Sequence, residues 1–306
     1  MKFIKTIPMA TCGLSLALAA LGNLVLPLPN GAIIRYICGA LSLIVLIIFA
    51  LKIFLDRGHA AEELKTPVPL SILPTSTMAI MLLCAYIRPH MPMVAQVIWY
   101  IALAVHICIM LAFCKRFVLG FKLGTVFPSW FIAGVGIVAA SVTAPAMGAV
   151  IIGQVAFYVG LVLYFVVLPL VVLRMNKVRI FPEPARKTVA IFTAPMSLLV
   201  VGYFSSFVSQ GQGRPILIYA MLAIAATSYV YVICMMPQLL KIKFYPTYAA
   251  FTFPYVISAM AFRLGANYIG NNALIVIADI TMWIAIAIVI YVLAHYYKYF
   301  RFWLKF

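Results

Sequence analysis

The stretch of residues 33–55, IIRYICGALSLIVLIIFALKIFL, decides the fold class of this chain. Its only charged residues are Arg35 and Lys52, and the sequence between them is almost entirely aliphatic. A helix needs about 20 mostly apolar residues to cross the hydrocarbon core of a bilayer. This segment meets that length and composition, so the sequence predicts a membrane-spanning helix.

The same pattern repeats along the chain, which is 67% hydrophobic and only 9% charged. Soluble domains average about 45–50% apolar and about 25% charged residues. We therefore expect an all-α polytopic membrane protein whose residues 1–306 form a single transmembrane domain without a separate soluble part. The expected spans are the ten apolar runs 7–26, 33–55, 69–87, 92–114, 126–144, 147–173, 188–208, 215–238, 246–264 and 271–296.

The N-terminal run has features of a secretory signal, because Lys2 and Lys5 precede an apolar stretch from Ala10 to Leu26. This stretch is long for a signal peptide, and no clear Ala-x-Ala cleavage site precedes Pro27. We expect it to be retained as the first transmembrane helix.

Charge placement excludes a nucleic-acid partner despite the formal net charge of +17. The basic residues lie between the apolar runs, as expected for a chain in a lipid bilayer. Of the 22 Lys and Arg, four (Arg35, Arg88, Arg214 and Arg263) fall on one predicted side and the other 18 on the opposite side. By the positive-inside rule, both termini are cytoplasmic and the number of spans is even. The composition favours a bacterial inner membrane.

Proline is concentrated in the odd-numbered runs, where Pro8, Pro74, Pro128, Pro195 and Pro254 are the candidate helix kinks. A proline removes a backbone donor and frees a carbonyl, which in a membrane must face protein or a wet cavity. The even-numbered runs carry fewer prolines, near their ends. This alternation predicts an inner layer of odd-numbered helices and an outer layer of even-numbered ones.

Small and hydroxylic residues also favour the odd-numbered runs, whereas stretches such as 41–51 are bulky and aliphatic. The candidate pore-lining residues are Thr11, Gly13, Thr75, Gly134, Ser197 and Thr252. The pattern predicts five helical hairpins in a quasi-fivefold ring around a central pore. Close helix packing through small residues is the alternative interpretation.

Ionisable side chains are scarce inside the predicted spans. His106 and Asp279 are the clear examples, and both fall on predicted outer helices, where a structural hydrogen-bonding role is at least as plausible as a functional one. The inner runs offer no acidic or histidine relay for a proton-coupled carrier. Arg263, near the outer end of its run, would attract anions at the outer mouth of a pore. Contact with lipid headgroups is the other interpretation of Arg263.

The sequence predicts no cofactor and no metal site. The six cysteines are scattered without a CxxC pair, so we interpret them as buried apolar thiols. Asp56, His59, Glu62, Glu63 and Lys65 share one segment, which we expect to be a solvated linker.

Three segments resemble one transporter family. Residues 248–260, YAAFTFPYVISAM, resemble the ninth helix of the tellurite-resistance/dicarboxylate transporter family, which includes the plant slow-type anion channels. Residues 186–196, RKTVAIFTAPM, are similar to the start of its seventh helix, and residues 127–140, FPSWFIAGVGIVAA, to its fifth. The order and spacing of these matches extend the resemblance over nearly the whole chain.

This resemblance implies ten helices in five hairpins around a central pore, assembled as a homotrimer. In the family, a phenylalanine of the ninth helix plugs the pore midway, and the matching position here is Phe253, beside Pro254. Ordinary core packing is the alternative role for Phe253. An aromatic ring across a narrow apolar constriction blocks water and ions, and a change of rotamer opens it.

The predicted function is a gated anion channel that passively conducts small inorganic or organic anions. The alternative is a secondary transporter or exporter of C4-dicarboxylates, sulfite or tellurite-related anions. An enzyme is disfavoured, because the predicted spans lack paired acidic residues, a histidine cluster or a nucleophile motif.

Overall fold

The computed structural model describes residues 7–178 and 182–304, and within these ranges the regular structure is entirely helical. It contains eight helical segments long and apolar enough to span a membrane, together with the shorter apolar helix α2 (Thr11–Leu24). The prediction of an all-helical chain with many apolar spans is confirmed. Lys2, Lys5, Arg179 and Lys305, which contributed to the predicted topology, lie outside the described residues.

Five long helices form the exposed layer of the molecule, and they match the even-numbered runs. Only 28–33% of the residues in their most apolar windows are buried, because aliphatic side chains on these helices point away from the protein. These helices are α3 (Gly31–Leu55), α7 (Pro92–Phe113, continued by the π-helical turn η1, Cys114–Val118), α10 (Val150–Lys177), α13 (Pro215–Leu240) and α15 (Asn272–Leu304).

The odd-numbered runs form the buried layer, and four of them are divided into helical pieces; three of these four are candidate spans. Of the residues in the most apolar windows of these three, 67–83% are buried. Their pieces are α5 (Pro67–Ile72) with α6 (Pro74–Ile87); α11 (Glu183–Arg186), η4 (Lys187–Thr193), α12 (Ala194–Ser206) and η5 (Val208–Gln210); and η6 (Pro246–Phe251) with α14 (Thr252–Ile269).

At three of the predicted kink positions the segment is divided, and a new helix begins at the proline or one or two residues before it. Pro74 begins α6, Pro195 is the second residue of α12, and Pro254 is the third residue of α14. Proline is tolerated in the first turn of a helix, since the amide donors there have no intrahelical acceptor. Pro8 precedes α2, and Pro128 precedes α8 (Trp130–Val135).

Run 126–144 does not form one continuous helix. It gives α8 and α9 (Val138–Thr143), with Gly136 and Ile137 between them, and η3 (Pro145–Met147) follows directly after it. A Cβ at Gly136 would lie 3.0 Å from Met78 Sδ and 3.3 Å from His106 Cε1, so the chain passes closely behind these side chains. In place of ten spanning helices, the described residues therefore contain eight candidate spans, α2 and this interrupted segment.

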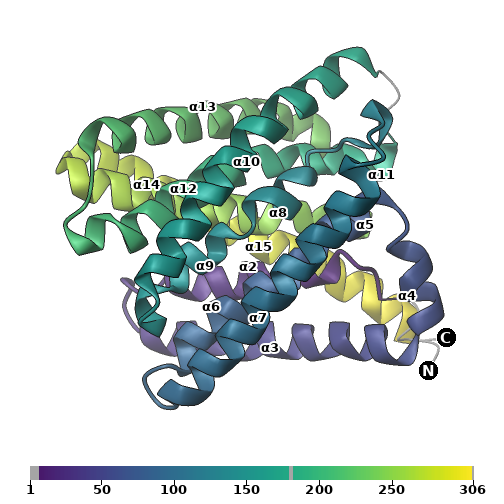
Figure 1. Ribbon diagram of the computed structural model, residues 1–306, viewed down its shortest axis with the longest axis horizontal. Coiled ribbons are helices and arrows are strands. Elements are labelled where there is room, and N and C mark those ends of the chain that lie inside the picture. Colours follow the sequence, from purple (N-terminus) through teal and green to yellow (C-terminus); the bar gives the residue numbers. More distant parts are fainter. Residues whose placement is uncertain (1–6, 179–181, 305–306) are drawn as a thin grey trace.

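Contacts between elements follow a regular order. Each buried element packs against the exposed helix that follows it, in the pairs α2–α3, α6–α7, α9–α10, α12–α13 and α14–α15. The buried elements also contact one another in the pairs α2–α6, α6–α9, α9–α12, α12–α14 and α14–α2. In Figure 1, α3 and α13 lie at opposite edges of the view, with α2, α8 and α9 between them.

Left-handed residues mark four of the connections from a buried element to the exposed helix that follows. These residues are Asn30 (φ 58°), Gly148 (φ 70°), Gly211 (φ 72°) and Gly270 (φ 70°). Side chains with a Cβ rarely adopt this conformation, and glycine and asparagine tolerate it best. These residues allow the chain to reverse direction within a few positions.

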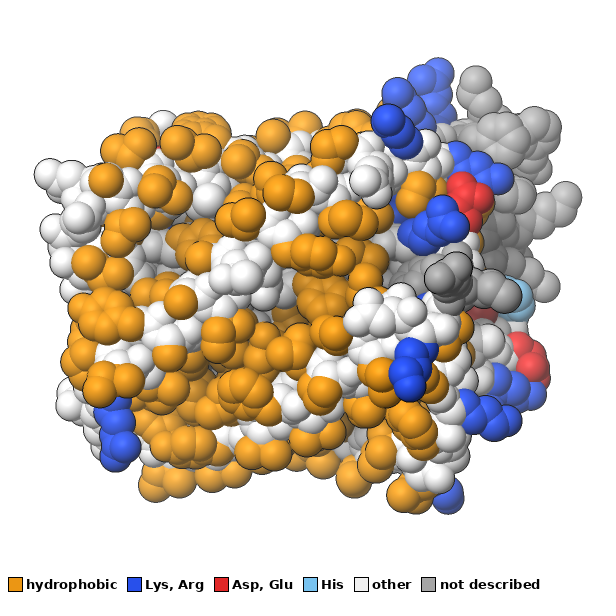
Figure 2. Space-filling view, turned by 90° about the horizontal axis from the view of Figure 1, so that it is seen from above, with side chains coloured by type: hydrophobic (Ala, Val, Ile, Leu, Met, Phe, Trp, Pro, Cys, Tyr) orange, Lys and Arg blue, Asp and Glu red, His pale blue; other side chains and the backbone are white. Residues whose placement is uncertain are grey.

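The opposite end of the molecule carries most of the charge, and the segment expected to be a solvated linker there is mostly exposed and connects α3 to α5. Residues Arg57–Glu63 form the short helix α4. The ammonium of Lys52, at the end of α3, is buried, pairs with the Glu63 carboxylate and donates to the Ile7 carbonyl. In Figure 2, basic and acidic side chains gather at one end of an otherwise largely apolar face.

The prediction that all six cysteines are buried is wrong for three of them. Cys12, Cys38 and Cys84 are buried, whereas Cys108 and Cys234 are exposed and Cys114 is partly exposed. Cys108 and Cys234 lie on α7 and α13, in the exposed layer. An apolar thiol needs no burial there, because the surface of these helices faces lipid.

Substitution of Gly202 by leucine is expected to destabilise the protein. A Cβ at Gly202 would lie 2.6 Å from Cγ1 of Val138, so a larger side chain forces α12 away from α9. Overpacking of this kind costs about 1–3 kcal/mol. We expect Gly202→Leu to lower the thermal unfolding temperature in detergent, whereas Gly58→Leu, at a site with nothing within 4 Å, leaves it nearly unchanged. Equal effects would contradict the close packing of α9 and α12.

Candidate functional site

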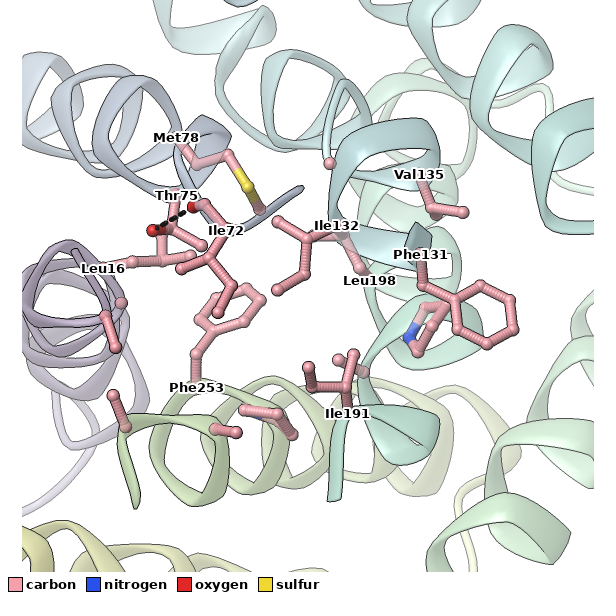
Figure 3. A pocket seen from close by; sticks show the side chains of 18 of the residues that line it. Leu16, Ile72, Thr75, Met78, Phe131, Ile132, Val135, Ile191, Leu198 and Phe253 are labelled. Atoms are coloured by element: carbon pink, nitrogen blue, oxygen red, sulfur yellow. Dashed lines mark hydrogen bonds between the residues drawn. The ribbon is translucent and has the colours of Figure 1, made fainter. Parts of the chain in front are cut away.

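A cavity of about 50 Å³ lies where the five buried segments meet. Every one of them contributes to its wall (Figure 3). The lining residues are Ala10, Gly13, Leu16, Ile72, Thr75, Met78, Phe131, Ile132, Val135, Gly136, Ile191, Ala194, Pro195, Leu198, Thr247, Ala249, Ala250, Phe253 and Pro254. None of these is ionisable, and the wall is predominantly apolar.

A second, smaller cavity of about 10 Å³ lies further along the same elements. Its lining residues are Ala20, Leu82, Ala139, Val142, Leu198, Phe253, Ile257 and Met260, again drawn from all five buried segments. Leu198 and Phe253 line both cavities. These two side chains therefore stand between the two hollow spaces.

Phe253 occupies the second position of α14, at the point where the 3₁₀ turn η6 changes into an α-helix. The Thr252 hydroxyl donates to the Ala249 carbonyl at 2.6 Å across this change, and Pro254 follows directly. The Phe253 side chain is 8% exposed. In Figure 3, its ring projects from α14 toward Ile72 and Ile132.

The predicted site residues divide into two groups in the structure. Gly13, Thr75, Pro195, Phe253 and Pro254 line the larger cavity. The others lie outside the walls of both cavities: Pro8, Thr11, Pro74, Pro128, Gly134, Ser197, Thr252 and Arg263. Whether any of these positions lines an open pathway stays a prediction.

Hydroxyl groups of the buried elements mostly bond between elements or to their own backbone. Ser197 and Ser258 join α12 to α14 through a 3.0 Å contact between their hydroxyl oxygens. Similar hydroxyl pairs are Ser71 with Ser129 (2.7 Å), Ser141 with Ser206 (3.2 Å) and Ser15 with Ser42 (2.9 Å). In lipid, a polar group without an internal partner is costly. These pairs therefore hold neighbouring elements together.

Two further predicted residues have local packing roles. Thr75 lines the larger cavity, but its hydroxyl donates to the Ile72 carbonyl at 2.8 Å and contacts Cys12 Sγ at 3.0 Å. Gly134 faces the exposed layer, since a Cβ there would lie 3.4 Å from Cβ of Leu163 on α10. Its small size lets α8 and α10 approach each other.

The ionisable residues inside the spans bind neighbouring helices. His106 Nδ1 lies 2.8 Å from the Thr77 hydroxyl and joins α7 to α6. Arg263 on α14 forms an ion pair with Asp279 on α15. These contacts agree with the structural roles considered for His106 and Asp279. The charge of Arg263 is balanced by the Asp279 carboxylate.

Sequence reasoning missed a buried cation close to the larger cavity. Lys187 is completely buried, and its ammonium donates to the carbonyls of Lys243 (2.7 Å) and Ile242 (3.3 Å). The same ammonium lies 3.0 Å from the ring centroid of Tyr248, in a cation–π contact. Lys187 thereby joins η4 to the segment that enters η6. The signal in the sequence is a lysine directly before a buried apolar run.

Lys243 lies outside the spans at the same end of the molecule. The Tyr245 side chain, and after it the Glu183 carboxylate, hold the pKa of the Lys243 ammonium above its usual value. Lys243 is therefore positively charged at neutral pH, and its carbonyl accepts the hydrogen bond from the buried Lys187 side chain.

A family model described as voltage-dependent anion channel, SLAC1, matches residues 4–297. The chain belongs to the SLAC1 family. The match covers nearly the whole sequence and confirms the resemblance noted from the motifs at 127–140, 186–196 and 248–260. A search among curated proteins gave no match.

SLAC1 membership makes the chain a multi-pass membrane protein of an anion channel and transporter family, and not an enzyme. It also identifies small anions as the class of solute. The family match assigns no role to a single residue, so the functions of Phe253 and Leu198 must be argued from their geometry.

The Ser197–Ser258 pair offers a direct test of how the inner elements are held together. Hydrogen bonds between membrane helices average about 0.6 kcal/mol and reach about 1.7 kcal/mol in double-mutant cycles. We expect a coupling energy in this range when Ser197→Ala and Ser258→Ala are measured singly and together by unfolding in detergent. A cycle of Ser197→Ala with Thr227→Ala on exposed α13 should be additive. Coupling near zero for the serine pair would contradict the contact.

Proposed function

We propose that this SLAC1-family protein is a gated channel for small inorganic or organic anions, with Phe253 as the gate. The observation that carries the proposal is that Phe253 stands between two cavities lined by the same five segments. On this view, the two cavities belong to one pathway along the axis of the molecule. The Phe253 ring closes the pathway between them, together with Leu198.

The proposed pathway runs through a quasi-fivefold ring of five helical hairpins. In support, the contacts among the buried elements form a closed cycle, α2–α6–α9–α12–α14–α2, and each element packs on the exposed helix that follows it. Such a cycle encloses a central axis, and the cavities lie where its members meet. The interrupted segment of α8 and α9 takes the place of the fifth span.

An apolar constriction blocks ions because an ion must lose its hydration shell to enter. The two cavities are small and predominantly apolar, and the hydroxyls of Thr75 and Thr247 in the larger one donate to backbone carbonyls, so little replaces lost water around an anion. Rotation of the Phe253 side chain would join the cavities without breaking a hydrogen bond. A ring at this position therefore closes the pathway completely and opens it at low energetic cost.

Passive conduction fits the cavity walls better than coupled transport. A proton-coupled carrier needs titratable groups along its path, and none lines either cavity among the described residues. Anions would be favoured over cations by the excess of basic residues, of which buried Lys187 and exposed Lys243 lie near η4 and η6. A field of this sign raises the local concentration of anions.

The proposal places both termini in the cytoplasm. In support, charged side chains gather at the end of the molecule that carries α4 (Figures 1 and 2). The positive-inside rule assigns a basic end of this kind to the cytoplasm.

A homotrimer in a bacterial inner membrane is also part of the proposal. The trimer rests on the family resemblance, and the membrane on the composition of the chain.

Removing the Phe253 ring tests the gate. We expect little anion current from the wild-type protein in planar bilayers and a current at least tenfold larger, selective for anions, from Phe253→Ala. Phe251→Ala is the matched control, because Phe251 is buried two positions away but lines neither cavity. Absence of current from correctly folded Phe253→Ala would overturn the channel and favour a carrier, which should saturate with substrate.

The ion pair of Arg263 predicts how charge affects conduction at that end of α14. In the Phe253→Ala background, the double variant Arg263→Gln/Asp279→Asn should conduct like its parent, because it removes a neutral pair. Arg263→Gln alone should reduce anion conductance, since it leaves the Asp279 carboxylate unpaired. A similar loss in both variants would show that Arg263 attracts anions itself. The readout is single-channel conductance at low ionic strength, where screening is weakest.

A further inference from the structure

A long groove lies on the outer surface between α10 and α13. It consists of two hollows of about 340 Å³ and about 300 Å³ that share Met175 of α10 as a common wall residue. The first extends to Thr227 in the middle of α13, and the second extends to Arg186 and Ile242. The two hollows adjoin at Met175, and each is far larger than either central cavity.

The length of the groove matches one leaflet of a bilayer. From Thr227 to Leu239, α13 advances by about 18 Å at 1.5 Å per residue. The hydrocarbon core of a bilayer is about 30 Å thick, so one leaflet accounts for about 15 Å plus its headgroups. The length of the groove therefore equals about the distance from the middle of a bilayer to its headgroups.

Its polarity changes along this length. The hydroxyls of Thr227 and Ser228 donate to carbonyls of their own helix at 2.9 Å, so they present no unsatisfied donor to the groove. At the other end, Arg186 lines the groove, and Lys177 and Lys241 are exposed at the adjoining ends of α10 and α13. Glu183 is the only acidic residue of the sequence between Lys177 and Lys241. The groove is thus apolar along its length and cationic at its end.

We propose that this groove binds one anionic phospholipid of the leaflet at the basic end, with its phosphate at Arg186 and an acyl chain along Met175 and Tyr231. Basic pockets between membrane helices at the cytoplasmic side bind anionic headgroups. The charge complementarity favours a lipid over a second copy of the chain. The proposal depends on the chain spanning a membrane and is independent of Phe253 as a gate.

The bound lipid contacts an element that also lines the central cavity. Phe192 and Val189 of η4 form part of the groove wall, and Ile191 of the same turn lines the larger cavity. The lipid therefore lies against the outer side of a segment whose inner side faces the cavity.

Native mass spectrometry of the purified full chain tests the site. The probes are palmitoyl-oleoyl phosphatidylglycerol and the corresponding phosphatidylcholine, which share their acyl chains and differ in net charge. We expect one phosphatidylglycerol per chain, retained at least tenfold more strongly than phosphatidylcholine. Arg186→Gln should remove this preference, whereas Arg116→Gln, at an exposed arginine beyond α7, should keep it. Circular dichroism and size exclusion verify the fold of each variant.

Blocking the apolar part of the groove gives an independent test. Thr227→Trp places a large ring in the groove from an exposed position and should reduce retention of both lipids. Equal retention of the two lipids by wild type, or equal losses in Arg186→Gln and Arg116→Gln, would overturn the proposal. Unchanged retention in Thr227→Trp would also overturn it. Loss of oligomers in Thr227→Trp without loss of lipid would overturn the proposal as well, because the groove would then be the binding site of a second copy of the chain.

Discussion

The absence of water in the bilayer core is the constraint on which the rest of this structure depends. Every buried polar group in the spans needs a partner inside the protein. The serine pairs between elements, the His106–Thr77 contact and the Arg263–Asp279 ion pair all meet this need, and each joins two neighbouring elements. The polar residues that the chain can place inside the membrane are thus largely used for assembly, which leaves the central cavities apolar.

An apolar centre determines the kind of gate that is physically available. A polar gate would need donors and acceptors that stay satisfied in both the closed and the open state. A single aromatic ring has no such requirement, since its contacts are dispersive and its rotation breaks no hydrogen bond. The division of the buried segment at η6 and α14 places Phe253 at the start of an α-helix, beside a proline. Sequence, helix division and cavity geometry are consistent at this residue.

Much of this architecture could be predicted from the sequence, because lipid imposes a simple code of length and hydropathy. The apolar runs and the contrast between buried and exposed helices follow from it, whereas Phe253 was singled out by the family resemblance of residues 248–260. The interrupted helix at Gly136 was not predicted, because hydropathy carries no information on the close approach of Gly136 to Met78 and His106. The hydrogen-bond partner of a hydroxyl such as that of Ser197 could not be predicted either. A small polar residue gives the same sequence pattern whether it faces a cavity or a neighbouring helix. Lys187 was missed because its acceptors are backbone carbonyls, which carry no sequence signal.

The apolar cavities and the basic charge of the chain have complementary effects on conduction. An apolar constriction alone excludes anions and cations alike, since both lose their hydration there. Selectivity must then come from charges outside the constriction, whose field acts over several ångströms in a medium of low dielectric constant. Lys243, exposed between α13 and η6 and positively charged at neutral pH, would contribute to such a field. In the proposed mechanism the two tasks are separate: a neutral ring would decide when the pathway is open, and charges outside the constriction would decide the sign of the ion.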